Sequence, residues 1–250
     1  MGKLNLPTVD EIIDEAFKNI LEKYGVKKLT QIPSDVPLSE IVNEVEEEAN
    51  RLYKEYEKEA VIEYMRRKGY SKMRSAVRGV LKILENSLVI TIANVRKSRG
   101  GHTVQRILAH ILRRGYDIPC EVGKINLDGY EADIAIPNKE AVVKEKWGFA
   151  LAVKRTLKER WREDSPVFKY PHSAFVFIKR GEGDFNLSKA NDMVAQGFKL
   201  VYIPDEVYKE YGEELEKKYP GVFKRLSDLP ADLNQFLKKK TCSTNASRNI

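Results

Sequence analysis

Five short apolar segments in the second part of the chain constrain its fold more than any other feature. Each is rich in aliphatic, β-branched or aromatic residues and is bounded by Gly, Pro, Asn or charged residues, as strands are. They are LVITIANV (88–95), GYEADIAIP (129–137), WGFALAVK (147–154), SAFVFIK (173–179) and FKLVYIP (198–204). Helical patterns separate several of these segments. The alternation predicts an α/β core with a mixed central sheet flanked by helices.

The first third of the chain is predicted to be a helical N-terminal extension. Thr8 and Glu11 have the spacing of a capping box, and apolar residues at helical spacing follow as far as Gly25. A long helical pattern covers 38–68, and another covers 71–85. The acidic run at 46–48 within the long pattern is expected to be a solvated helix face, since such charge runs usually are.

Two further segments complete the predicted helices. Before Gly115, one helical face is lined by Val104, Ile107, Leu108, Ile111 and Leu112. His110 lies opposite this face and is expected at the surface. The strand at 149–154 leads directly into a basic segment that is predicted to be helical, with Leu157 on its apolar side. The final ten residues, TCSTNASRNI, have no apolar periodicity and are predicted to be disordered.

The composition narrows the class of partner and the compartment. Lys and Arg total 44 against 37 Asp and Glu, which gives a net charge of +7 and a pI near 9.1. An anionic partner such as nucleic acid fits this excess, although a solvated basic surface gives the same sum. The two cysteines fit neither a disulfide framework nor a zinc cluster. There is no signal peptide and no apolar run of membrane-spanning length. We therefore expect a soluble, cytoplasmic protein that does not associate with membranes.

Two charged residues stand on neighbouring predicted strands. Within EADIAIP, alternation puts Glu131 and Asp133 on one face, and within FALAVK it puts Ala152 and Lys154 on one face. Adjacent strands would bring Asp133 close to Lys154. Phosphodiester hydrolysis needs a divalent cation held by carboxylates and a positive group beside the scissile phosphate. For Asp133 the alternative is a strand-end residue that caps a turn or forms a structural ion pair with Lys154. For Lys154 it is a lysine whose stem lies along the strand end and whose ammonium reaches solvent.

This arrangement is similar to the core of PD-(D/E)xK nucleases, in which an acid usually lies two residues before the lysine. Here that position holds Ala152. Three segments resemble a variant of this core, the type II restriction endonucleases related to EcoRII and PspGI. RKSRGG (96–101) resembles the family segment RKSRAG, and KRTLKERWR (154–162) resembles K-x-x-x-K-x-RWR. SKANDMVAQGFKLVYIPDEVY (188–208) has the family's closing order of helix, Gly, strand and Pro. The resemblance covers roughly residues 88–211.

The resemblance implies a Mg²⁺-dependent endonuclease that acts on double-stranded DNA as a homodimer, at a short CC/GG-type palindromic or near-palindromic site. Asp133 would hold the metal, and Lys154 would polarise the scissile phosphate or orient the water. The family has two further glutamates, which match Gln105 and Val167 here. Gln105 is expected to offer an amide oxygen to hydrated Mg²⁺. Glu163 or Asp164, one helical turn before Val167, is expected to supply the other carboxylate.

The same resemblance gives the predicted DNA contacts. Arg96 and Arg99 are candidates for reading guanine, because bidentate Arg contacts to O6 and N7 are the commonest specific ones. The other predicted contacts are Lys97, Ser98, Gly100 and His102 near the start of the helix, and Lys158, Arg160 and Arg162 beyond the catalytic lysine. An ordinary basic turn and a solvated helix face are the alternatives for these two groups.

The sequence predicts a helical N-terminal region at 1–86, a restriction-endonuclease-like catalytic core at 87–226, and a C-terminal helix with a disordered tail at 227–250. Two alternative functions remain at this point. One is a sequence-specific DNA-binding relative that has lost cleavage, because the positions of Gln105 and Val167 lack the family glutamates. The other is a nucleic-acid repair or processing factor that does not read sequence and binds through charge alone.

Overall fold

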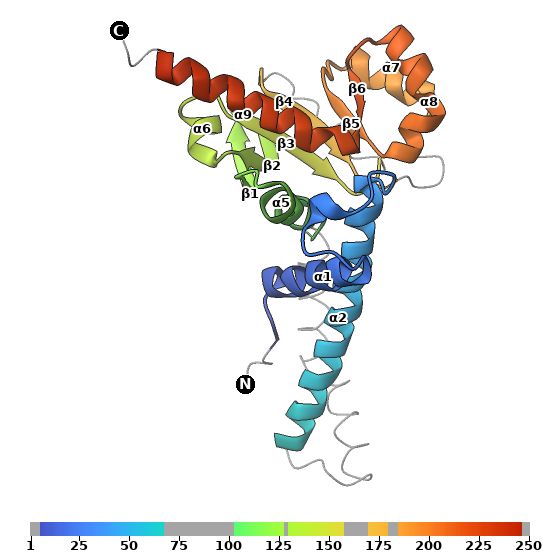
Figure 1. Cartoon of the computed structure of the whole chain (residues 1–250), viewed down its shortest axis with the longest axis vertical. Coiled ribbons are helices and arrows are strands. Elements are labelled where there is room, and N and C mark those ends of the chain that lie inside the picture. Colours follow the sequence, from blue (N-terminus) through green and yellow to red (C-terminus); the bar gives the residue numbers. More distant parts are fainter. Residues whose placement is uncertain (1–5, 68–102, 128–129, 158–169, 180–184, 247–250) are drawn as a thin grey trace.

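The computed structural model describes residues 6–67, 103–127, 130–157, 170–179 and 185–246. Within these ranges six strands form one mixed sheet in the order β1-β2-β3-β4-β5-β6 (Figure 1). The strands are β1 (Glu121–Leu127), β2 (Tyr130–Ile136), β3 (Phe149–Lys154), β4 (Ser173–Phe177), β5 (Val201–Ile203) and β6 (Phe223–Arg225). The pairs β1-β2 and β2-β3 are antiparallel, and the remaining pairs are parallel. The predicted α/β fold with a mixed sheet is confirmed.

The strand predictions agree with the structure at four of the five segments. The segments at 129–137, 147–154, 173–179 and 198–204 contain β2, β3, β4 and β5. The segment at 88–95 lies outside the described residues. The strands β1 and β6 were not predicted. Each parallel strand after β3 is reached through a helical connection or a connection outside the described residues, as parallel pairing requires.

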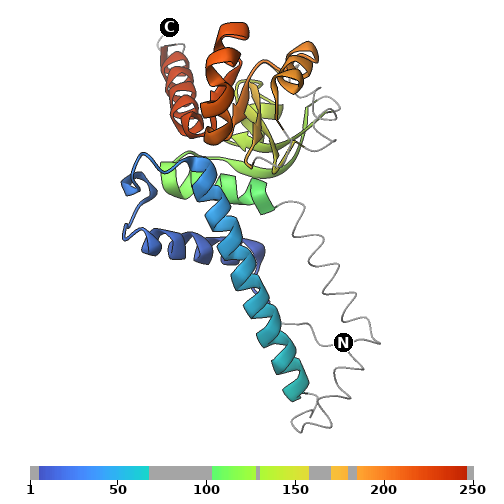
Figure 2. The ribbon, with the colours of Figure 1, turned by 90° about the vertical axis from the view of Figure 1, so that its right-hand side faces the viewer.

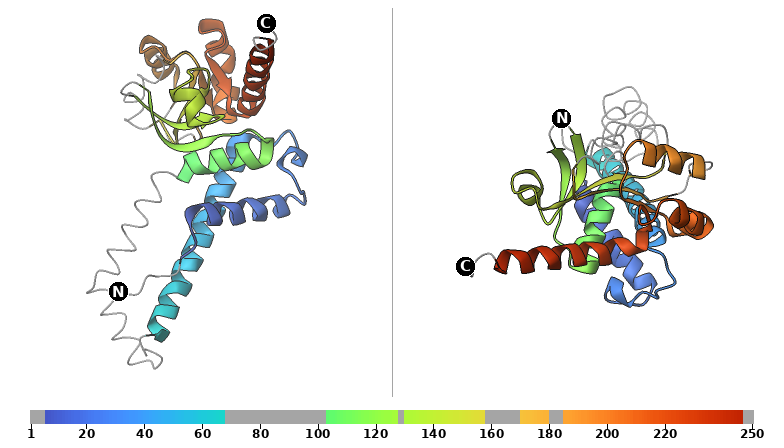
Figure 3. Two further views of the ribbon diagram at one scale, coloured as in Figure 1. Left: turned by 90° about the vertical axis from the view of Figure 1, so that its left-hand side faces the viewer. Right: turned by 90° about the horizontal axis from the view of Figure 1, so that it is seen from above.

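Helices cover both faces of the sheet. One face carries α1 (Val9–Lys23), α2 (Leu38–Arg67), α5 (Thr103–Tyr116) and α9 (Leu229–Ala246). The other carries α6 (Lys139–Val143), α7 (Leu187–Ala195) and α8 (Asp205–Lys218). Short 3₁₀ helices occur at Leu29–Gln31 and Leu226–Asp228. Figure 3 shows α5 between the sheet and α1, so the sheet and the N-terminal helices share one hydrophobic core.

The predicted apolar face of α5 is buried along its whole length. Its five apolar residues are at most 7% exposed, and they pack against the sheet and against α1 and α2. The prediction that His110 lies at the surface is wrong. His110 is 8% exposed because Phe17 of α1 covers its ring, with the two ring centroids 5.1 Å apart. Burial lowers the pKa of His110. A second helix thus packs on a face of α5 that its own periodicity marks as polar.

The N-terminal helices that the structure describes form as the sequence predicts, and the helix predicted at 71–85 lies outside the described residues. The Thr8 hydroxyl accepts from the Glu11 backbone N–H, and the Glu11 carboxylate accepts from the Thr8 backbone N–H at 2.7 Å, which completes the capping box. Gly25 has φ +65° just after α1, where a left-handed residue ends a helix readily. The helix α2 agrees with the predicted 38–68 and runs from the sheet past α1 (Figure 2).

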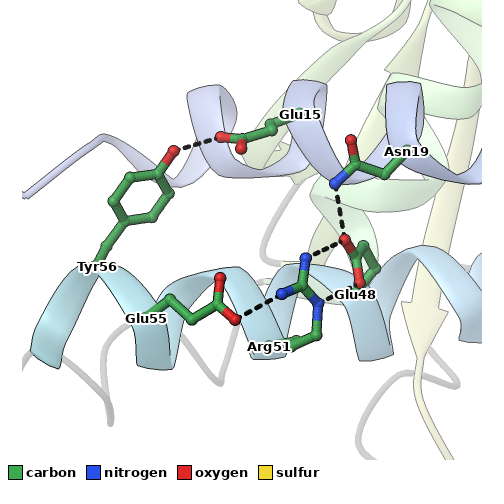
Figure 4. Close-up of polar contacts among 6 residues, drawn as sticks. All are labelled: Glu15, Asn19, Glu48, Arg51, Glu55 and Tyr56. Carbon is green, nitrogen blue, oxygen red and sulfur yellow. Dashed lines mark hydrogen bonds and ion pairs between the residues drawn. The ribbon is translucent and has the colours of Figure 1, made fainter.

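Polar side chains join α1 to α2 beyond their apolar contact (Figure 4). The Glu48 carboxylate accepts hydrogen bonds from Asn19 and from Arg51, each at 2.7 Å. The Tyr56 hydroxyl donates to Glu15 at 2.5 Å. The Glu48 side chain is only 17% exposed, and these bonds, chiefly those from Arg51, lower its pKa to about 2. Glu48 is therefore a structural carboxylate between two helices.

The acidic run at 46–48 is not the solvated face that was predicted. Glu47 is exposed, but Glu48 joins α1, and Glu46 is only 7% exposed. The reason is helical phase: Glu46 follows Val42 at the i+4 spacing and precedes Ala49 at i+3, so it falls on the buried stripe of α2. Charge alone did not reveal this position.

The predicted disorder of the last ten residues is wrong as far as Ala246, because α9 continues to that residue. The helix is attached to the sheet at its start. Leu229 and Leu233 are buried in the core, and the Asp232 carboxylate accepts from the Tyr202 hydroxyl at 2.7 Å and from Lys224 at 2.8 Å. A helix that is already nucleated adds residues at little cost, which explains the extension. Among the helices in the described ranges, none is long and apolar enough to cross a membrane.

Candidate active site

Lys154 is the last residue of β3 and lies at the carboxyl end of the central parallel strands. The five preceding residues of β3, Phe149 to Val153, are all buried, and Lys154 is half-buried. Its partner across the parallel ladder is Phe177, and its carbonyl accepts from the Ile178 N–H at 3.1 Å. The chain then bends at Arg155. The helix predicted to start directly after Lys154 is thus absent at 155–157, and its remainder lies outside the described residues.

Asp133 lies on β2 next to this strand end. The pairing of Ile134 with Leu151, continued by one residue, puts Asp133 level with Ala152. The Asp133 carboxylate extends to β3, where its Oδ2 accepts from the Val153 backbone N–H at 2.7 Å. Asp133 therefore contacts the residue directly before Lys154. Ala152, at the position two residues before the lysine where PD-(D/E)xK nucleases usually have an acid, is fully buried.

A β-bulge in β1 lies opposite Asp133. Val122 pairs with Ile134 and Ile125 pairs with Ala132, which leaves Gly123 and Lys124 facing the single residue Asp133. Gly123 has φ +128°, a conformation that side chains rarely permit. Bulges increase the local twist and re-aim side chains, often beside active sites. Consistent with this, Ala132 and Ile134 pack into different hydrophobic clusters, so the regular alternation predicted for β2 is interrupted at Asp133.

Gln105 reaches the same point from the first turn of α5. Its Nε2 lies 3.4 Å from Asp133 Oδ1 and 3.4 Å from the Val153 carbonyl oxygen, so one amide group connects two strands. The Gln105 side chain is 7% exposed, and its Oε1 is buried without a hydrogen-bond partner within the described part of the chain. The structure thus brings together Gln105, Asp133 and Val153, the residue before Lys154. The assignment of catalytic and metal-binding roles at this point stays a prediction.

The donor atoms at this site suit a hard cation. An Asp carboxylate and an orphaned amide oxygen are oxygen ligands of the kind that Mg²⁺ prefers. Across the ranges that the structure describes, no group of three or more His, Cys, Asp and Glu could hold a metal by itself. Any further carboxylate must come from elsewhere, and the predicted candidates Glu163 and Asp164 lie outside the described residues.

The remaining predicted site residues also lie outside the described residues. They are Arg96, Lys97, Ser98, Arg99, Gly100, His102, Lys158, Arg160 and Arg162, together with Val167 at the position of a family glutamate. Their assignment to DNA contacts stays a prediction.

One charged contact beside Lys154 was not predicted. The Arg155 guanidinium lies 3.1 Å from the Glu46 carboxylate of α2, with Arg155 56% and Glu46 9% exposed at their side chains. Burial raises the pKa of Glu46, while Arg155 and Lys179 oppose that shift. The sequence signal for a buried acid at this point was the helical spacing of Glu46, which falls on the apolar stripe of α2.

Comparison with known proteins bears on the overall fold. No protein-family model matches the sequence, and none of the curated proteins matches it. Among solved structures, the chain is similar to the restriction endonuclease PspGI in a complex with substrate DNA. The identity is 26%, the TM-score is 0.64, and the match covers 94% of this chain and 95% of that one.

Two structures of metal-depleted Ecl18kI are also similar, one with uncleaved DNA and one with uncleaved, modified DNA. They are 17% and 18% identical to this chain, each with a TM-score of 0.58, and each match covers 94% of this chain and 80% of Ecl18kI. The N-terminal helices are included in matches of this extent, so the likeness is not confined to the sheet. The chain has the restriction-endonuclease fold of the EcoRII/PspGI-like group.

Proposed function

We propose that this protein is a site-specific endonuclease for double-stranded DNA, a type II restriction enzyme that hydrolyses phosphodiester bonds with Mg²⁺. The observation that carries the proposal is the contact of Asp133 and Gln105 with Val153, directly before Lys154. These contacts support a site at the carboxyl end of β3, because the Asp133 carboxylate and the Gln105 amide adjoin the strand that ends in Lys154. The similar solved structures, which contain DNA, support the choice of substrate.

Each residue of the site has a distinct role in this proposal. Asp133 and the Gln105 amide oxygen would hold Mg²⁺, with Glu163 or Asp164 as the third oxygen ligand. Bound there, the ion would supply a water of lowered pKa and offset charge on the phosphate. Lys154 contacts the scissile phosphate or orients the attacking water. The bond from Val153 to Asp133 holds the carboxylate against the backbone of β3 next to Lys154, which supports catalysis by positioning.

The proposed target is a short CC/GG-type palindromic or near-palindromic site that a homodimer cuts in both strands. Arg96 and Arg99 would read guanine, and Lys158, Arg160 and Arg162 would contact phosphates. The net charge of +7 supports binding to a polyanion.

Plasmid digestion with Mg²⁺, followed by sequencing of the fragment ends, tests the proposal. We expect discrete fragments with the wild-type protein, and none with EDTA or with Lys154→Ala. The lysine variant should still bind DNA in a gel-shift assay, because the substitution removes one contact near the reacting phosphate. Random degradation, or discrete fragments that persist with Lys154→Ala, would refute the proposed site.

A second candidate function is sequence-specific DNA binding without cleavage. It is favoured by the Gln105 amide nitrogen, which faces Asp133 where a glutamate would bring negative charge. An intact plasmid combined with tight, site-dependent binding would support this alternative. Binding that depends steeply on salt but not on DNA sequence would instead indicate a factor that binds through charge alone.

A further inference from the structure

Glu46 of α2 connects the N-terminal extension to the strand that carries Lys154. Its carboxylate is 3.1 Å from the Arg155 guanidinium. Arg155 is the residue immediately after Lys154, so this contact is one peptide unit from the proposed catalytic group. Lys179, just beyond β4, adds positive potential at the same carboxylate.

The two neighbours of Lys154 are both held by side chains from other elements. On one side, Val153 donates its N–H to Asp133 and accepts from Gln105. On the other side, the Arg155 carbonyl accepts from the Lys179 N–H at 2.9 Å, and the Arg155 side chain pairs with Glu46. Since the peptide groups before and after Lys154 are fixed, the direction in which its side chain leaves the strand is fixed as well.

Glu46 is well suited to hold Arg155, because its own helix cannot move independently of the core. Val42 and Val45 are fully buried, and Ala49 is 6% exposed, all on the same stripe of α2. Arg155, by contrast, is more than half exposed at its side chain and lies in a bend. A long exposed side chain samples many rotamers unless a rigid partner restrains it. The buried carboxylate supplies that restraint.

We propose that Glu46 is a positioning residue that acts through Arg155 to orient Lys154 for phosphodiester cleavage. This inference rests on the proposed endonuclease function. Its consequence is that part of the N-terminal extension belongs to the active site, although it contacts neither substrate nor metal. The pair should affect the rate of the chemical step more than DNA affinity, because it holds a reacting group and not a binding surface.

The first test compares Glu46→Gln with the matched control Glu47→Gln, which removes the same charge from the exposed neighbouring residue. Single-turnover cleavage is measured with Mg²⁺ on a short duplex that carries the site cut by the wild type, and affinity is measured without metal. We expect Glu46→Gln to lower the cleavage rate constant by about tenfold to a hundredfold, with DNA affinity unchanged. Glu47→Gln should match the wild type in both measurements.

A double-mutant cycle separates positioning from simple stabilisation. Arg155→Gln leaves the buried Glu46 without its partner, so its melting temperature should fall, and Glu46→Gln/Arg155→Gln should recover it because no uncompensated buried charge remains. The cleavage rate constant of the double variant should remain as low as that of the slower of the two single variants. Recovery of the cleavage rate together with the melting temperature would overturn the proposal.

The remaining outcomes are also decisive. Wild-type cleavage rates in Glu46→Gln would overturn the positioning role and leave the endonuclease function intact. A wild-type protein that cuts no DNA would refute the proposed function, and with it this inference. Equal losses of rate and DNA affinity would assign the pair to DNA binding instead.

Discussion

At position 105, glutamine differs from glutamate by one atom, an amide nitrogen in place of a carboxylate oxygen. This difference changes the chemistry of the site. The Gln105 amide nitrogen approaches Asp133 Oδ1, and its amide oxygen is buried without a partner in the described ranges. A glutamate there would put a second carboxylate beside Asp133. Two adjacent carboxylates repel each other unless a cation lies between them. The present glutamine therefore favours a site that is stable without metal, at the expense of metal affinity.

We predict that Gln105→Glu makes the protein depend on Mg²⁺ for stability and increases its affinity for the ion. Without metal, its melting temperature should fall below that of the wild type because of the carboxylate repulsion. With Mg²⁺, the melting temperature of the variant should rise by more than that of the wild type, since a ligand stabilises the state that binds it. At a Mg²⁺ concentration of a hundred times Kd, the free energy of unfolding increases by about 2.7 kcal/mol. Thermal unfolding at a series of Mg²⁺ concentrations measures this.

The control for this variant is Gln196→Glu, the same change at the exposed C-cap residue of α7. It should respond to Mg²⁺ as the wild type does. If Mg²⁺ stabilises Gln105→Glu no more than it stabilises the control, Gln105 does not lie near a metal site.

At the residue level, the sequence predicted the strands of Asp133 and Lys154 but not the direction of the Asp133 side chain. Asp133 and Lys154 lie on neighbouring strands, as predicted. The spacing of two could not predict that the Asp133 carboxylate bonds to Val153, because the bulge in β1 interrupts the alternation of β2 at Asp133. For Glu46, the charge of its neighbours suggested solvent, while the helical phase that buries it required weighing Val42 and Ala49 instead.

At the scale of elements, the α1-α2 contact depends on polar bonds as well as on its apolar stripe. Glu48 accepts from Asn19 on one helix and Arg51 on the other. Its pKa of about 2 lies below the ordinary value of 4.5, chiefly because of the bond from Arg51. A carboxylate with a lowered pKa contributes stability that is fully present above pH 4.5 and is lost as the pH falls toward 2.

We predict that Glu48→Gln lowers the free energy of unfolding by about 1 kcal/mol at pH 7, the usual size for a partly screened, charge-assisted bond. The difference in free energy of unfolding between variant and wild type should shrink below pH 4.5, because the stabilisation from the ionised wild-type carboxylate then begins to be lost. Urea unfolding at pH 7 and pH 3 measures both differences, with the exposed Glu47→Gln as control. A deficit of equal size at both pH values would show that the charge of Glu48 is not its source.

Elements were predictable from sequence when their periodicity was strong. The apolar stripe of α5 and the buried runs of β3 and β4 had such patterns. In contrast, β1 (EVGKINL) mixes charge with a glycine, and β6 has only three residues. Both strands form because the neighbouring strands offer hydrogen-bonding partners, a tertiary effect that local sequence does not encode. The extension of α9 to Ala246 likewise depends on its attachment to the sheet.

On the scale of the whole molecule, the N-terminal helices and the sheet are packed as one unit. A single hydrophobic cluster includes residues of α1, α2, α5, α9 and the central strands. The long helix α2 contributes Glu46 at the sheet and continues past α1 (Figure 2). Because the chain has one copy of Lys154 and duplex DNA has two strands, cleavage of both strands in one binding event would need two protein copies. A palindromic site matches such a pair by its own two-fold symmetry.

We predict that a homodimer cuts both strands and that each subunit cuts one. Supercoiled plasmid should pass directly to linear DNA with the wild type, without accumulation of nicked circles, because both active sites are bound at once. Co-expression of differently tagged wild-type and Lys154→Ala chains, with purification through both tags, isolates the mixed dimer. This dimer should accumulate nicked circles before linear DNA forms, since only one subunit retains the lysine and the second strand can be cut only after release and rebinding. If the doubly tagged species cannot be recovered, or if it linearises plasmid as fast as the wild type, the two-subunit model is wrong and each chain must reach both strands by rebinding.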